Sequence, residues 1–173
     1  MATKKAIGVI FGILVISAWV LGFVTQAGAE TLKCRTASTS TKIETIPVSD
    51  EEGHVLGVQI LQGLAFFENG EIAKMRSHSI YDFISGKGSQ AINYNIYTFK
   101  DGATIVVRVQ RLTIPDTSGS YSAKTTSEII KGTGRFEGIK GTASATGENF
   151  SASEGEAARN FSDVTWTYTL PPK

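Results

Sequence analysis

The chain has 173 residues, of which 41% are hydrophobic and 19% are charged, with 17 Lys and Arg against 16 Asp and Glu. This length fits one domain, and the formal charge of +1 argues against a basic protein that binds nucleic acid. A single cysteine excludes an intramolecular disulfide and any zinc or iron–sulfur site built from several cysteines. With only two histidines, His54 and His78, the sequence predicts no metal site, and it indicates no cofactor.

The N-terminus has the three parts of a secretory signal. Lys4 and Lys5 precede an apolar run over 6–24, and the small-residue pattern Ala27-Gly28-Ala29 follows. We expect cleavage after Ala29, so that 1–29 is a signal peptide and 30–173 is one secreted or periplasmic domain. Because the apolar run is long enough to cross a bilayer, an uncleaved N-terminal membrane anchor is the alternative. We expect Cys34, near the new N-terminus, to be a spare thiol rather than an intermolecular link.

The remainder of the chain is typical of β structure. Short runs rich in Val, Ile, Thr, Tyr and Phe are broken by Gly, Asn, Asp and Ser, and no long segment has a helical period. Even spacing without a longer repeat predicts an all-β fold, either a sandwich or a closed barrel. The predicted strands are 32–46, 55–67, 72–84, 91–100, 103–113, 121–131, 141–149 and 163–170.

Two dipeptides, Asn69-Gly70 and Asp101-Gly102, predict β-hairpins with two-residue type I′ turns, in which both residues have φ > 0. In the first hairpin we place Lys74 and Arg76 outward, because burying unpaired charges costs roughly several kcal/mol each. Inward side chains predicted from these registers and from the alternation of 163–170 are Val58, Ile60, Gln62, Leu64, Phe66, Ala73, Met75, Ser77, Ser79, Tyr81, Tyr94, Ile96, Thr98, Ile105, Val107, Val109, Val164, Trp166, Tyr168 and Leu170. The outward set includes Leu61, Asn93, Asn95, Tyr97, Val106, Arg108 and Gln110. For 121–131 and 141–149 the inward face stays open.

A glycine-rich segment surrounds Phe136. Its four glycines are Gly132, Gly134, Gly138 and Gly141. A phosphate-binding loop does not fit, because no Gly-Lys-[Ser/Thr] ending and no predicted helix follow. We expect the glycines to turn the sixth strand sharply into the seventh, and Phe136 to close one end of a barrel.

The sequence of 129–142 is Ile-Ile-Lys-Gly-Thr-Gly-Arg-Phe-Glu-Gly-Ile-Lys-Gly-Thr. It resembles the G-G-T-G-x-F-x-x-x-x-G segment of dirigent proteins and the matching segment of allene oxide cyclases, two families of one barrel superfamily. The hairpin 91–110, the strand 163–170 and Gln62-Gly63-Leu64 resemble further parts of these proteins in the same order. The resemblance implies an eight-stranded antiparallel β-barrel with a cavity open at one end. It also implies a homotrimer packed through the barrel wall, where outward Leu61, Tyr97 and Val106 would suit an interface.

The same resemblance implies a small amphipathic ligand, hydrophobic or phenolic, inside the barrel. The predicted ligand-binding residues are the inward polar and aromatic side chains Gln62, Ser77, Tyr81, Tyr94, Trp166 and Tyr168. Ordinary filling of the barrel by hydroxyl groups with satisfied hydrogen bonds is the alternative for these positions. Other functions left open are an isomerase or cyclase, a dirigent-like coupling factor acting by confinement, and a structural envelope protein.

Glu128 is the candidate catalytic residue. If this carboxyl group points inward, desolvation raises its pKa and it can act as an acid or a base. If it points outward, it is a solvated surface carboxylate. No catalytic role is carried over from either family.

Overall fold

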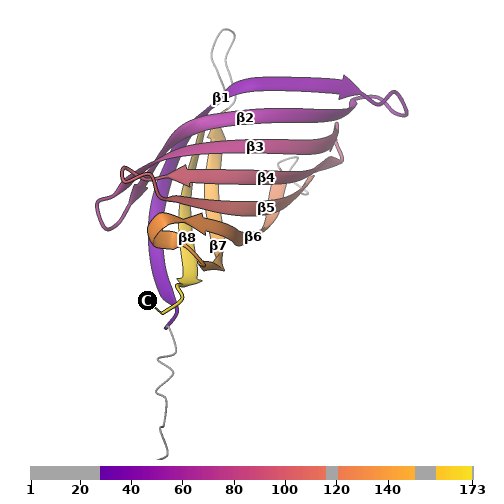
Figure 1. Cartoon of the computed structure of the whole chain (residues 1–173). Helices are drawn as coiled ribbons and strands as arrows, with labels where there is room; N and C mark the ends of the chain where they lie inside the picture. Colours follow the sequence, from indigo (N-terminus) through magenta and orange to yellow (C-terminus); the bar gives the residue numbers. More distant parts are fainter. Residues whose placement is uncertain (1–27, 116–120, 151–158, 173) are drawn as a thin grey trace, which may run out of the picture.

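The computed structural model describes residues 28–115, 121–150 and 159–172. In these ranges eight antiparallel strands pair in chain order around a closed barrel, with β8 returning to β1 (Figure 1). The elements are β1 (Glu30–Pro47), β2 (His54–Phe67), β3 (Ile72–Ile84), β4 (Gly88–Thr98), β5 (Thr104–Pro115), β6 (Tyr121–Thr133), the 3-10 helix η1 (Gly134–Phe136), β7 (Lys140–Phe150) and β8 (Arg159–Thr169). The predicted eight-stranded barrel is confirmed, and the sandwich alternative is wrong.

The predicted signal peptide lies almost entirely outside the described residues. In the ranges that the structure describes, no helix is long and apolar enough to cross a membrane. Cleavage after Ala29 and export therefore remain predictions.

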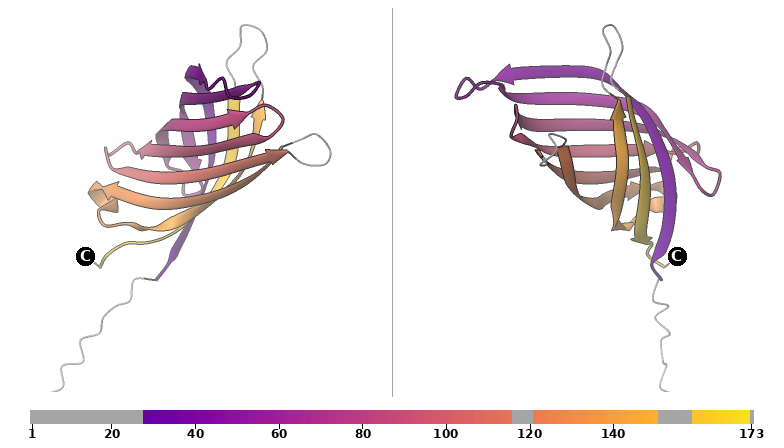
Figure 2. Two further views of the ribbon diagram at one scale, coloured as in Figure 1. Left: turned by 90° about the vertical axis from the view of Figure 1, so that its right-hand side faces the viewer. Right: turned by 180° about the vertical axis from the view of Figure 1, so that it is seen from behind.

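The barrel has two unequal sides. Strands β2 to β5 run side by side on one side, β7 and β8 lie on the other, and the long strand β1 curves between them (Figure 2). A bulge between Ser40 and Lys42 interrupts the pairing of β1 with β2. Between β6 and β7, three residue pairs close the barrel, from Ser127–Ala143 to Ile129–Gly141.

Both hairpins have three-residue loops instead of the predicted two-residue turns. The amide of Phe67 donates to the carbonyl of Glu71, and the amide of Phe99 donates to that of Ala103, at 2.9 Å each. Gly70 and Gly102 both have φ of 84°, whereas Ser49 is the only non-glycine residue with positive φ in the described chain. A type I turn followed by a left-handed glycine fits this pattern, and a type I′ turn does not.

This one-residue change of register reverses which side chains of β2 and β4 point inward, because successive side chains on a strand point to opposite faces. The inward residues of β2 are therefore Leu61, Gly63, Ala65 and Phe67, while those of β4 are Asn93, Asn95 and Tyr97. The predicted inward orientation of β2 and β4 is wrong, and so is the predicted outward orientation of Leu61 and Tyr97. Predictions for the other three strands hold: β3 buries Met75 and Ser77, β5 buries Val107, and β8 buries Trp166.

Aromatic rings fill the end of the barrel that contains both three-residue loops and η1, here called the closed end. The ring centroid of Phe67 lies 5.2 Å from Phe99 and 5.5 Å from Trp166, and that of Phe99 lies 4.9 Å from Phe136. We refer to Phe67, Phe99 and Phe136 as the aromatic plug. The register of the two hairpins creates it, since Phe67 and Phe99 are the last inward residues before the two loops.

The glycine segment positions Phe136 in this plug. Gly134 and Gly138 have φ of 62° and 76° at the two ends of η1. A Cβ atom at Gly132 would lie 2.0 Å from the carbonyl oxygen of Phe136, so only glycine allows the chain to pass this closely. The side chain of Phe136 is buried as a result.

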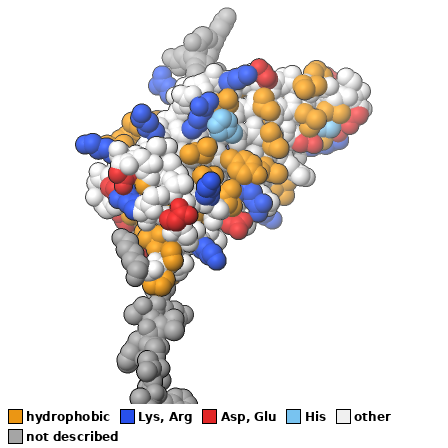
Figure 3. Space-filling model, viewed as in Figure 1, with side chains coloured by type: hydrophobic (Ala, Val, Ile, Leu, Met, Phe, Trp, Pro, Cys, Tyr) orange, Lys and Arg blue, Asp and Glu red, His pale blue; other side chains and the backbone are white. Residues whose placement is uncertain are grey.

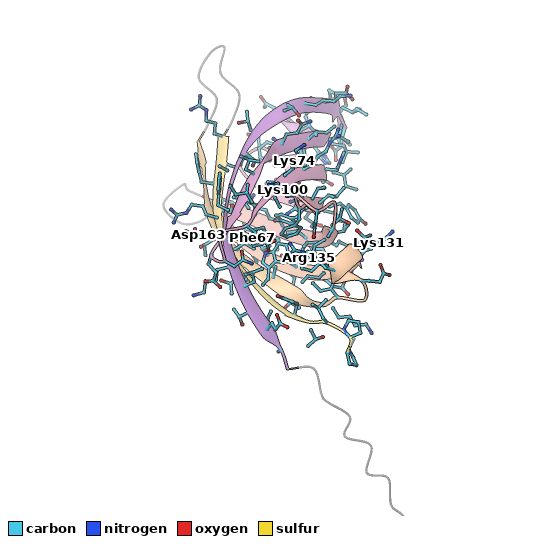
Figure 4. The ribbon with its side chains drawn as sticks, turned by 60° about the vertical axis from the view of Figure 1, so that its left-hand side comes forward. Phe67, Lys74, Lys100, Lys131, Arg135 and Asp163 are labelled. Carbon is cyan, nitrogen blue, oxygen red and sulfur yellow. The ribbon has the colours of Figure 1, made fainter. Side chains whose placement is uncertain are left out.

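Arg135 covers the plug from outside. Its guanidinium carbon lies 4.9 Å from the ring centroid of Phe99 and 4.7 Å from that of Phe136, and the same group forms ion pairs with Glu71 and Asp101. Figure 4 views the molecule so that Phe67 and Arg135 lie near its middle, with Asp163 and Lys131 on opposite sides. The closed end thus combines ring packing with the paired charge of Arg135.

Candidate functional site

A cavity of about 600 Å³ lies inside the barrel beside the aromatic plug. The side chains of Tyr97 and Trp166 form its deep end, and their ring centroids are 4.8 Å apart. The described lining residues are Thr36, Ser38, Leu61, Met75, Ser77, Asn93, Asn95, Tyr97, Val107, Val109, Arg111, Thr125, Ser127, Ala143, Ala145, Thr146, Gly147, Asn160, Ser162, Val164 and Trp166. The lining therefore joins an apolar wall to many small polar groups, as ligand-binding pockets do.

The mouth of this cavity lies between β6 and β7. Their ladder ends at the pair Ser127–Ala143. The lining residues just beyond that pair, Thr125, Ala145 and Thr146, are exposed to solvent. The two strands therefore close the barrel near the plug and give access to the cavity farther along.

Three buried polar atoms in this cavity have no hydrogen-bond partner in the described part of the protein. They are Asn95 Oδ1, Arg111 Nε and Trp166 Nε1. An unpartnered buried polar atom costs about 1–3 kcal/mol, so such atoms are rare in folded proteins. All three residues line one cavity, so its wall gathers one acceptor and two donors that the described protein leaves unpaired.

Another polar pair on the same wall is already satisfied. The hydroxyl of Ser79 donates to Asn93 Oδ1 at 2.6 Å, so this amide oxygen has a protein partner. Arg111 is the only Asp, Glu, Lys, Arg or His among the described lining residues. The described lining of the cavity therefore carries one positive charge, that of Arg111.

The six predicted ligand-binding residues separate into four groups. Ser77 and Trp166 line the cavity. Tyr168 is inward but lies at the closed end, where its hydroxyl donates to Glu30 at 2.9 Å. Tyr81 lies across from Gly57, outside the lining of the cavity. The inward predictions for the remaining two, Gln62 and Tyr94, are wrong, because both lie on the exposed outer face.

Glu128 lies outward on β6. Its carboxylate accepts a hydrogen bond from Arg108 Nη2 at 3.0 Å, across the pair that joins β6 to β5. On β6 the inward residues are instead Ser127 and Ile129. The interpretation of Glu128 as a solvated surface carboxylate is therefore correct.

Sequence analysis did not identify Asn95 and Arg111. Asn95 was missed because the register of its hairpin was wrong by one residue. A signal for Arg111 was present, since the inward alternation of Val107 and Val109 continues to residue 111. Extending the alternation by one step would have placed a charged group inside the barrel.

Three inward groups of the barrel stay protonated at neutral pH. Burial, followed by the nearby Asp163 charge, raises the pKa of Cys34 to about 12, and burial also raises the pKa of Tyr97. Burial and the hydrogen bond with Glu30 raise the pKa of Tyr168 to about 12. Cys34 is thus a buried, unreactive thiol in this fold, in line with the spare thiol expected from the sequence.

A groove of about 1070 Å³ crosses the outer face of β1 to β6. Its apolar side chains include Leu56, Val58, Ile80 and Ile92, all exposed. Figure 3 shows hydrophobic side chains gathered over β2 to β5 on this face, with Lys and Arg around them. Arg111 is the only described residue that lines both the groove and the cavity, and it shares the inward face of β5 with Val107 and Val109.

Near the start of β2, Asp50, Glu51 and His54 bring three possible metal ligands within 4.8 Å of one another. His54 uses both ring nitrogens, Nδ1 with Asp50 at 2.6 Å and Nε2 with Asp82 at 2.9 Å, while Glu51 pairs with Lys87. The groups therefore form a satisfied ion-pair network at the end of the barrel opposite the plug.

No family model matches the chain, and a comparison with curated proteins finds no match. Two solved structures are similar to it, those of the pterocarpan synthase dirigent proteins GePTS1 and PsPTS1. GePTS1 has 13% identity and a TM-score of 0.43, with 83% of this chain and 92% of that chain covered. PsPTS1 has 14% identity and a TM-score of 0.43, with 84% and 97% covered. Both are dirigent proteins, the family that the glycine segment resembles.

Proposed function

We propose that the protein is an exported barrel that binds one small amphipathic molecule in its interior cavity. The observation that carries this proposal is the convergence of the unpartnered atoms of Asn95, Arg111 and Trp166 on one cavity of about 600 Å³. That volume lies within the range of about 300–1,000 Å³ typical of small-molecule sites. A ligand that pairs with these atoms would offset their desolvation.

The lining determines the character of the ligand. Met75, Val107, Val109 and Val164 supply apolar surface, and Trp166 supplies an aromatic wall. Polar groups lie between them, so a purely apolar molecule would leave donors and acceptors unpaired. An amphipathic molecule, such as a fatty acid derivative or a phenolic compound, satisfies both parts.

Binding is favoured over acid–base catalysis. The described lining residues include no Asp, Glu or His that could transfer a proton at neutral pH. The alternative function is an isomerase, cyclase or coupling factor that acts by confining its substrate, which needs the cavity but no such group.

The test is calorimetric titration of the purified full-length protein with four probes: decanoate, decanol, 4-phenylbutyrate and 4-phenyl-1-butanol. We expect at least one probe to bind with one site per chain. Mass spectrometry of an organic extract of the protein asks in parallel whether a ligand copurifies. Absence of binding by all four probes, with no copurified compound, would contradict the proposed function.

Two neighbouring threonines on β6 distinguish the interior from the outer groove. Thr125 lines the cavity near its mouth and Thr126 lines the groove, and both are exposed. Thr125→Phe should weaken probe binding by roughly tenfold or more, whereas Thr126→Phe should leave it unchanged. The opposite result would move the binding site to the groove.

We also propose that the outer groove packs against a second copy of the chain. Val58, Ile80 and Ile92 form a cross-strand row of exposed apolar side chains, and contiguous apolar patches of this kind mark protein interfaces. The sequence resemblance implies a homotrimer. Light scattering tests this: Ile80→Glu should reduce the mass of the assembly, and a monomeric wild-type protein would contradict it.

A further inference from the structure

Arg111 differs from three other arginines of the chain, which form ion pairs. Arg35 pairs with Asp163, and Arg135 pairs with Glu71 and Asp101. On the same strand as Arg111, the outward Arg108 pairs with Glu128. Arg111 alone points into the cavity, and no ion pair or hydrogen bond of its side chain occurs in the described part of the chain.

Among the described residues that line the cavity, none offers Arg111 a counterion. Its cross-strand neighbours are Ala91 on β4 and Thr125 on β6, and the described lining of the cavity has no carboxylate. A guanidinium group binds a carboxylate through two parallel N–H donors, and Nε is one of its donors. Arg111 therefore brings to the cavity wall a guanidinium group that has no counterion in the described lining.

We propose that the interior ligand is a monocarboxylate whose carboxylate pairs with Arg111 at the mouth of the cavity. This inference rests on the proposed interior binding and names the chemical class of the ligand. A single guanidinium balances one negative charge, which favours a carboxylate over a dianion. The ligand is identified by this chemistry alone: an anionic head with an apolar body.

The position of Arg111 also orients the ligand. Thr125, its partner on β6, is one of the exposed residues at the mouth, so the carboxylate stays close to solvent and loses less hydration than it would at the deep end. From Arg111 the next inward residues of β5 are Val109 and Val107. Four residues of a strand extend about 13 Å, which accommodates an apolar body directed from the mouth towards Trp166.

The test compares each acid with its neutral alcohol by calorimetry at a pH where the acids are ionised: decanoate with decanol, and 4-phenylbutyrate with 4-phenyl-1-butanol. We expect each acid to bind at least tenfold more tightly than its alcohol, which is about 1.4 kcal/mol. Arg111→Gln should remove this difference, because it weakens binding of the acids more than binding of the alcohols. Arg111→Lys should retain part of it, because the charge remains.

Arg108→Gln is the matched control, since it removes a positive charge from the outer face of the same strand. It should leave the preference for acids intact. If the alcohols bind as tightly as the acids, or if Arg111→Gln keeps the preference, the carboxylate inference is overturned while interior binding stands. If none of the four probes binds to the wild-type protein and no compound copurifies with it, both proposals are overturned.

Discussion

The two ends of the barrel interior satisfy their polar groups in different ways. At the closed end, Arg135 stacks on the aromatic plug and pairs with two carboxylates, and Tyr168 donates to Glu30. In the cavity, Arg111 near the mouth and Asn95 and Trp166 farther in have atoms with no partner in the described protein. One barrel thus contains an arginine at the closed end that is paired twice and an arginine near the mouth that has no ion pair in the described chain.

This difference separates stability from function. Paired charges and packed rings lower the free energy of the folded state, whereas unpartnered buried groups raise it. Natural proteins keep such costly groups mainly where they bind or react. Substitutions at the closed end should therefore change unfolding, and substitutions near the mouth should change binding.

The largest effect is expected for Phe136→Ala, which removes one ring of the plug. Loss of a buried phenylalanine costs roughly 3–5 kcal/mol, and Phe136 is buried against Phe99. Unfolding by denaturant measures this change in free energy. Phe66→Ala is the control, since Phe66 is 43% exposed on the outer face and should change stability by much less. An equal loss in both variants would contradict the assigned register.

A smaller loss is expected for Gly132→Ala. The new methyl group would lie 2.0 Å from the carbonyl oxygen of Phe136, and overpacking of this kind costs about 1–3 kcal/mol. Gly70→Asn is the control, because asparagine tolerates positive φ and the space around this position is open. If Gly132→Ala were neutral in denaturant unfolding, the glycine segment would not position Phe136 by close approach.

The order of the strands could be predicted from sequence, and so could the inward faces of some of them. The eight strands were predictable because turn residues separate runs of β-forming residues. Faces were predictable on β3, where Lys74 and Arg76 mark the outer side, and on β5, where Arg108 does so. On β3 these charges are decisive, whereas on β5 the inward Arg111 is an exception to the same rule.

Faces were not predictable on β2. Apolar residues occupy both of its sides, with Leu64 and Phe66 outside and Leu61 and Phe67 inside, so alternation carries no information. The register then depended on the turn alone, and a Gly after Asn or Asp suits both two-residue and three-residue loops. Asn95 was predicted to point outward for the same reason, because the register of its strand was taken from the turn at Asp101-Gly102.

Replacing Arg135 and replacing Arg111 by methionine should change the stability of the protein in opposite directions. Arg135→Met should destabilise the protein by about 1 kcal/mol, the size of a partly exposed cation–π contact with surface ion pairs. Arg111→Met should have the opposite sign, with a gain of up to about 1 kcal/mol, because it removes an unpartnered buried donor. Denaturant unfolding of both variants in the absence of ligand measures the two signs. A loss of stability in Arg111→Met would mean that the mouth is built for stability as the closed end is.

The smallest expected effect is the pH dependence of the network around His54, at the end opposite the plug. Its hydrogen bond with Asp50 raises the pKa of His54, with a further contribution from Asp82, and partial burial opposes the shift. The same bond lowers the pKa of Asp50.

A raised histidine pKa means that the folded state binds the proton more tightly than the unfolded state does. Its contribution to stability is therefore complete below the unfolded value of about 6.5 and is lost as pH rises through the higher folded value. The Asp50 contribution runs the other way: it is present above about 3.9 and is lost as pH falls. The network should be most stabilising between these limits.

Thermal unfolding of wild-type protein and His54→Gln as a function of pH tests this. The difference between their midpoints should be largest between about pH 4 and 6.5 and should shrink as pH rises further. Asp82→Asn should give a smaller difference of the same shape, because the Asp50 hydrogen bond remains. A difference that does not change with pH would show that His54 contributes through packing alone.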